Sequence, residues 1–101
     1  MTDAATNQKL TDEDLLLKVK DYRLLSGDYQ DAAIKLHITG VINSMLSAGV
    51  SEDIARSEQA VDVIAHAVYD IFTGSGDYSP YVNMRINQLR AESKYKTEEA
   101  L

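Results

Sequence analysis

Apolar side chains recur every three or four residues along most of the chain, and alternation of apolar with polar residues is missing. This period matches one face of an α-helix, whereas alternation would indicate a half-buried strand. We therefore expect an all-α protein, a small single-domain bundle of about four helices. The pattern places the helices at about 12–24, 28–48, 58–73 and 80–93, with a short turn at 51–56.

Polar residues and glycines mark where these helices begin and end. Thr11 precedes three acidic residues and predicts a helix start, because its side chain can cap the helix and the helix dipole favours carboxylates there. Gly49 can adopt the positive φ that ends a helix, and Val50 supplies the apolar contact that often follows. Ser79 predicts another start, with Pro80 at the first helical position, where no N–H donor is needed.

The segment 28–48 has the widest apolar stripe in the chain. A wide stripe indicates burial on more than one side, so we expect this helix to be the central one. Gly40 inside it costs roughly 1 kcal/mol relative to alanine. Both a close helix crossing and simple tolerance would explain that glycine. The stripe comprises Tyr29, Ala33, Ile34, Leu36, Ile38, Gly40, Val41, Ile42, Met45 and Leu46.

The helical segments define one domain at residues 11–93, as the length of 101 residues also suggests. Residues 1–10 are polar, and we expect a flexible N-terminus. Residues 94–101 present no apolar face, and we expect a mobile C-terminal tail. An ordered role for Tyr95 in this tail would require another chain.

Charge is unevenly distributed along an acidic chain of net charge −6, with ten basic and sixteen acidic residues. This balance argues against a general nucleic-acid binder, which needs a basic surface. Residues 50–79 hold six acidic residues and one basic, whereas 80–97 hold four basic and one acidic. The two stretches could meet within one chain or between neighbouring chains, or each could be a solvated face.

Residues that support catalysis or metal binding are sparse. The chain has no cysteine, which excludes disulfides, thiolate nucleophiles and cysteine metal sites. His37 and His66 lack a second histidine or carboxylate at clear metal-ligand spacing, so we expect no metal, no cofactor and no enzymatic activity. No apolar run approaches the ~18 residues of a membrane span, and Met1–Leu10 lacks a signal-peptide core, so we expect no membrane partner.

Three stretches resemble the phage head–tail connector family, the small helical adaptors beneath the portal. The resemblance covers about residues 11–90. The Ala-Gly-Val helix end and the Ser-Pro-Tyr helix start are moderately specific together. The stretches are Asp21-Tyr22 with Gly27-Asp28-Tyr29; Ile42 to Val50 (INSMLSAGV); and Ala65 to Phe72 (AHAVYDIF) followed by Gly74-Ser75-Gly76, Ser79-Pro80-Tyr81 and Gln88-Leu89.

The resemblance implies a structural subunit of the virion that docks on the portal protein as a ring, typically dodecameric. Such a ring extends the DNA channel and provides the attachment surface for the tail. The implied partners are the portal, further copies of the chain and a tail-side completion or stopper protein, while DNA passes through without sequence-specific binding. The implied location is the head–tail joint, and the host cytoplasm during assembly. Matched positions with a structural role are Gly49, Val50, Ser79, Pro80 and Tyr81.

Charge suggests which residues would meet these partners. The acidic candidates for a ring interface or channel face are Glu58, Asp62 and Asp70. The candidates for contact with the portal or a neighbouring copy are Arg85, Arg90, Lys94, Tyr95 and Lys96. The alternative is a small acidic helical regulator or protein-binding module. A DNA-reading helix at 32–49 is disfavoured, because its only Lys or Arg is Lys35.

Overall fold

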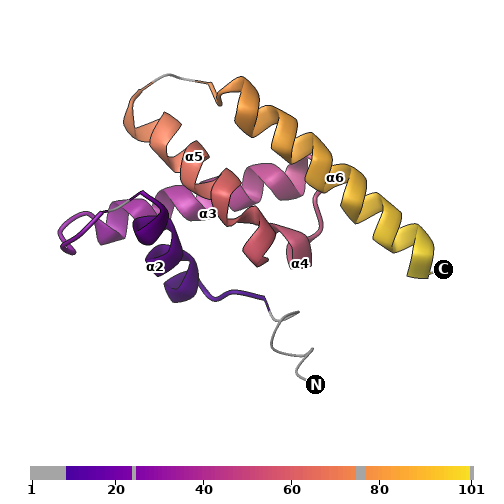
Figure 1. Cartoon of the computed structure of the whole chain (residues 1–101), viewed down its shortest axis with the longest axis horizontal. Coiled ribbons are helices and arrows are strands. Elements are labelled where there is room, and N and C mark those ends of the chain that lie inside the picture. Colours follow the sequence, from indigo (N-terminus) through magenta and orange to yellow (C-terminus); the bar gives the residue numbers. More distant parts are fainter. Residues whose placement is uncertain (1–8, 24, 75–76, 101) are drawn as a thin grey trace.

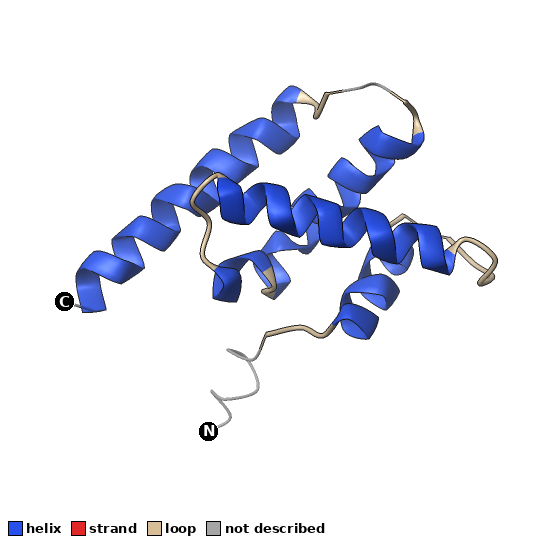
Figure 2. Ribbon diagram, turned by 180° about the vertical axis from the view of Figure 1, so that it is seen from behind, coloured by secondary structure: helices blue, strands red, loops and turns tan. Residues whose placement is uncertain are grey.

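The computed structural model describes residues 9–23, 25–74 and 77–100, and within them every regular element is a helix (Figures 1 and 2). The all-α prediction and the small bundle are confirmed. The helix positions agree with the sequence pattern to within three residues, except at the C-terminal end. The elements are α2 (Asp12–Tyr22), α3 (Asp31–Ser47), α4 (Glu52–Ala55), the 3-10 turn η1 (Glu58–Ala60), α5 (Val61–Phe72) and α6 (Pro80–Ala100).

Helix α5 is the centre of the bundle and packs against α2, α3 and α6. Half of its twelve residues are buried: Val61, Val63, Ile64, Ala65, Ala67 and Val68. The expectation that segment 28–48 is the central helix was therefore wrong. Helix α3 buries one side, and on its other side Leu36 is 69% exposed.

The neighbouring helices contribute apolar stripes to one continuous core around α5. From α2 come Leu15, Leu16 and Val19; from α3 come Ile34, Ile38, Val41, Ile42 and Met45; from α6 come Val82, Ile86 and Leu89. These positions recur at three- and four-residue spacing, which is why the sequence pattern located the helices correctly.

The start of α2 is a capping box, as Thr11 predicted. The Asp14 N–H donates to Thr11 Oγ1 and the Thr11 N–H donates to Asp14 Oδ2, both at 3.1 Å. Each bond satisfies an N–H that the helix leaves without a partner. The backbone hydrogen bond from Thr11 lowers the pKa of the Asp14 carboxyl below its usual value.

The end of α3 is a Schellman motif, as Gly49 and Val50 predicted. Gly49 has φ +104°, and its N–H donates to the Leu46 carbonyl at 3.1 Å. The Val50 N–H donates to the Met45 carbonyl at 3.0 Å, and both side chains are buried. At the start of α6, Ser79 Oγ accepts the Val82 N–H at 3.3 Å, which confirms the predicted cap.

At both ends of the chain, the structure describes contacts or helix within segments that were predicted to be flexible, and their flexibility stays a prediction. The N-terminal segment was expected to be flexible through residue 10, and residues 1–8 lie outside the described part of the chain. Lys9 and Leu10, however, are attached to α4: Lys9 pairs with Glu52 at 3.2 Å, and the Leu10 N–H donates to the Arg56 carbonyl at 2.8 Å.

The last helix is longer than its apolar pattern indicated. It was expected to end at 93, before a mobile tail, but α6 continues to Ala100. The buried stripe continues through a polar residue, Ser93, which is 5% exposed. Its hydroxyl accepts the Ser51 N–H and donates to the Leu89 carbonyl, both at 2.9 Å. A hydropathy pattern does not predict the burial of a serine, because that burial depends on the hydrogen bonds of its hydroxyl group.

We expect Gly49→Ala to lower the free energy of unfolding by about 1–2 kcal/mol, because a side chain at positive φ is strained. A Cβ there would also lie 3.1 Å from Cγ of Arg90. Urea denaturation followed by circular dichroism measures the change. The control is Gly40→Ala inside α3, where a Cβ meets nothing within 4 Å and stability should rise by about 0.5–1 kcal/mol. Equal effects of the two substitutions would contradict this account of Gly49.

Candidate functional site

The solvent side of α5, between α2 and α6, carries most of the polar contacts that join these helices. Residues four apart share one side of a helix, which aligns Asp62, His66 and Asp70. We call this surface the α5 face. It comprises Glu58, Gln59, Asp62, His66, Tyr69 and Asp70, with Lys18, Tyr22 and Arg23 from α2 and Tyr81 and Arg85 from α6.

His66 lies between two tyrosine rings from different helices. The ring centroid of Tyr22 is 5.6 Å away in an edge-to-face arrangement, and Tyr22 Oη lies 3.4 Å from His66 Nε2. On the other side the Tyr81 ring is tilted, with its centroid at 4.9 Å. This stacking ties α2 and α6 to α5.

Asp62 receives a hydrogen bond and a charge from α6. The Tyr81 hydroxyl donates to its carboxylate, and Arg85 Nε lies 3.6 Å from Oδ2. Partial burial acts to raise the pKa of Asp62, but the Tyr81 hydrogen bond and the Arg85 charge lower it below the usual value. The same hydrogen bond raises the pKa of Tyr81. The acidic and basic stretches therefore meet within one chain at this point.

Each of the three acidic candidates interacts with a group of its own chain. Glu58 pairs with Lys18 at 2.6 Å, and its hydrogen bond raises the pKa of Lys18. Asp62 binds Tyr81 and Arg85, and Asp70 accepts the Ser79 N–H at 2.8 Å. Their partners belong to α2, to α6 and to the cap of α6, so these carboxylates join elements of the fold.

The basic candidates divide into two groups. Arg85 is largely buried, and its Nη2 donates to the Gln59 carbonyl at 3.1 Å. Arg90, Lys94 and Tyr95 are exposed, Tyr95 at 63%, although the stem of Arg90 lies over Gly49. Lys96 lies in α6, and its side chain is outside the described residues. In Figure 1 this end of α6 extends beyond the rest of the bundle.

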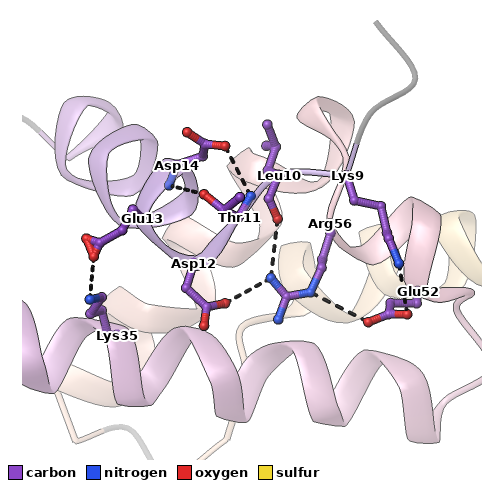
Figure 3. A network of polar contacts seen from close by, with 9 residues as sticks. All are labelled: Lys9, Leu10, Thr11, Asp12, Glu13, Asp14, Lys35, Glu52 and Arg56. Carbon is purple, nitrogen blue, oxygen red and sulfur yellow. Dashed lines mark hydrogen bonds and ion pairs between the residues drawn. The ribbon is translucent and has the colours of Figure 1, made fainter. Parts of the chain in front are cut away.

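A polar network joins the chain before α2 and the start of α2 to α4, and no sequence pattern predicted it (Figure 3). Arg56 Nη1 donates to the Leu10 carbonyl at 3.3 Å and to Asp12 at 2.9 Å, and its Nε lies 3.8 Å from Glu52. Arg56 is more than forty residues from Leu10 and Asp12 in the sequence, so no local motif predicts the contact. The network attaches the chain before α2 to α4.

The described residues show no candidate metal site. They contain no group of three or more histidines and carboxylates that could hold a metal ion. A shallow depression of about 260 Å³ is lined by Asp70, Ile71, Gly74, Asp77 and Tyr78. The Tyr78 hydroxyl there donates to Ser44 at 3.3 Å, which joins the segment before α6 to α3. None of the helices described here has the length and hydropathy needed to cross a bilayer.

Comparisons of the chain with protein-family models, with curated proteins and with solved structures find no match.

We expect Asp62→Asn to lower the free energy of unfolding by about 1–2 kcal/mol at pH 7, because two interactions with a charged acceptor are weakened. The pKa of Asp62 is lower in the folded state than in the unfolded state, where it is about 4. The contribution of Asp62 to the free energy of unfolding is therefore complete above about pH 4 and is lost as the pH falls below that value. The difference between wild type and variant should therefore shrink in urea titrations from pH 6 to pH 3. A constant difference would contradict the assignment.

Proposed function

We propose that the protein is a structural subunit of a phage head–tail connector. It docks on the portal as a ring, extends the DNA channel and provides the attachment surface for the tail. The observation that supports this proposal best is the projecting end of α6. There Arg90, Lys94 and Tyr95 are exposed, and no ion pair or ring contact engages them within the described chain.

An exposed tyrosine beside two cations suits contact with another protein. Tyrosine and arginine are enriched in protein interfaces, since both bury apolar area while keeping a polar group at the edge. Lys94 and Tyr95 extend beyond Ser93, the last residue of the buried stripe of α6. A partner surface can therefore reach them without disturbing the bundle, and we assign them, with Arg90, to a contact with the portal or with a neighbouring copy on it.

The remaining surface charge suits a conduit for DNA. The net charge is −6, and Lys9, Lys18, Lys20, Lys35, Arg56 and Arg85 are each paired with a carboxylate. Strong binding to DNA requires several cations that face the phosphates. A ring of such subunits would let DNA slide. Arg85 is left out of the portal contact, because it holds Asp62 and Gln59 within the chain.

The first test is disruption of the gene in its parent phage, followed by negative-stain electron microscopy of the particles. We expect DNA-filled or leaking heads without tails, beside free tails, because the joint between them is missing. Normal, infectious tailed particles would contradict the proposal and favour the alternative of a helical regulator.

We further expect the double variant Arg90→Glu with Lys94→Glu to bind purified portal rings at least tenfold more weakly than wild type. The control is Lys9→Glu with Lys18→Glu, which changes the net charge equally and breaks only two exposed ion pairs of small energetic value. Biolayer interferometry measures binding, and thermal melting verifies that both variants fold. Equal affinity of the two double variants would refute the assignment of these residues.

A further inference from the structure

The solvent side of α3 is a helix face without charge. The two ionic residues of this helix, Asp31 and Lys35, are half-buried and pair with Lys20 and Glu13 of α2. A helix with a solvated side ordinarily places charged residues there. The exposed positions along its centre are instead uncharged and recur at spacings of three and four, and we call them the α3 seam: Ala33, Leu36, Gly40, Asn43 and Ser47.

The solvent side of α6 carries a second seam with the same spacing. Its buried stripe is Val82, Ile86, Leu89 and Ser93, and the opposite side is free of charge along its centre. We call this side the α6 seam: Met84, Gln88, Ala91 and Tyr95. Alternating spacings of three and four are those at which two helices pack side chains into each other's gaps.

The two seams belong to helices at different depths of the molecule, and each seam is exposed to solvent within its own chain. Helix α6 is nearer the viewer in Figure 1, whereas α3 crosses in front of the bundle in the reverse view of Figure 2. The seams therefore do not meet within one chain. A contact between the α6 seam of one copy and the α3 seam of another repeats head to tail, which is the arrangement that builds a ring.

The side chains of the seams are complementary in size. At the middle of the α3 seam, Gly40 leaves an opening where even a Cβ would meet nothing within 4 Å. The α6 seam presents longer side chains at its middle and end, including Met84, Gln88 and Tyr95, with Met84 48% exposed. A long side chain entering the gap beside a glycine is the ridge-into-groove contact of packed helices.

Charges beside the seams are also complementary. Arg90 and Lys94 flank the α6 seam, whereas Asp28 precedes α3 and Asp53 follows it. All four side chains are exposed, and no ion pair within the described residues engages them. A copy of α6 laid along α3 thus brings cations toward a carboxylate in either direction.

We propose that the α6 seam of one copy packs on the α3 seam of the next. This inference rests on the proposed function, because it names the contact between neighbours in the ring. Helix α3 is about 25 Å long and about 10 Å wide, a footprint of roughly 250 Å². Stable pairs bury roughly 800 Å² per partner. The contact is therefore weak in dilute solution and forms at high concentration or on a portal.

Cross-linking tests the contact directly, because the chain has no cysteine of its own. Chains bearing Gly40→Cys and chains bearing Gln88→Cys are mixed at about millimolar concentration with a short thiol cross-linker. We expect the mixed product to exceed each like-with-like product at least fivefold. The control replaces the first chain by Leu17→Cys, an exposed position of α2. Dominance of the Gln88 product alone, or equal yield in the control, would overturn the inference.

A charge placed in the seam provides a second readout. We expect Leu36→Glu, introduced into the Gly40→Cys chain, to reduce the mixed product at least fivefold by bringing an unpaired carboxylate into the contact. The matched control is Leu17→Glu, since Leu17 is 60% exposed and Leu36 69%. Melting temperatures verify that both variants fold. Undiminished cross-linking by Leu36→Glu would overturn the inference.

Gene disruption and cross-linking together distinguish failure of the proposed interface from failure of the proposed function. Tailless particles after gene disruption, together with failed cross-linking, would leave the connector function standing and overturn this interface alone. Normal tailed particles with efficient cross-linking would establish a self-associating protein with another role.

Discussion

Burial of α5 is the constraint on which the other helices depend. Helix α5 has twelve residues, half of which lie in the core, and α2, α3 and α6 all pack against it. Two of its buried residues, Ala65 and Ala67, are small, which allows neighbouring helices to approach closely. Because α5 occupies the centre, α3 needs only one apolar side to complete the core. The exposed seam of α3 is therefore a direct consequence of how α5 is packed.

Local features of the fold could be predicted from the sequence, because each depends on a few adjacent residues. The cap at Thr11, the helix end at Gly49 and the start at Ser79 are of this kind. The central helix was assigned wrongly, since the width of an apolar stripe reveals how much apolar surface exists and not what covers it. The end of α6 was missed because residues 94–100 present no apolar face, so the hydrophobic pattern stops at Ser93 although the helix continues to Ala100.

For the candidate site, the sequence could predict which charged residues are present but not which of them contact each other. Opposite charge in 50–79 and 80–97 indicated that the two stretches could meet, and the structure places Asp62 beside Arg85 in one chain. The sequence could not divide the basic residues, because Arg85 and Arg90 differ only in what surrounds them. The first is fixed by Asp62 and Gln59, and the second is exposed over Gly49. Three-dimensional contacts thus separate charges that join elements of the fold from charges that are exposed to solvent.

The hydrogen bonds of Ser93 have a mechanical consequence for the end of α6. Among the side chains that the structure describes, they are the last hydrogen bonds that fasten the helix to the bundle, beside the start of α4. Beyond it, residues 94–100 form about two further turns, or roughly 10 Å of helix. This is about one helix diameter. A surface that bound the end of this helix would therefore lie about one helix diameter from the attachment at Ser93.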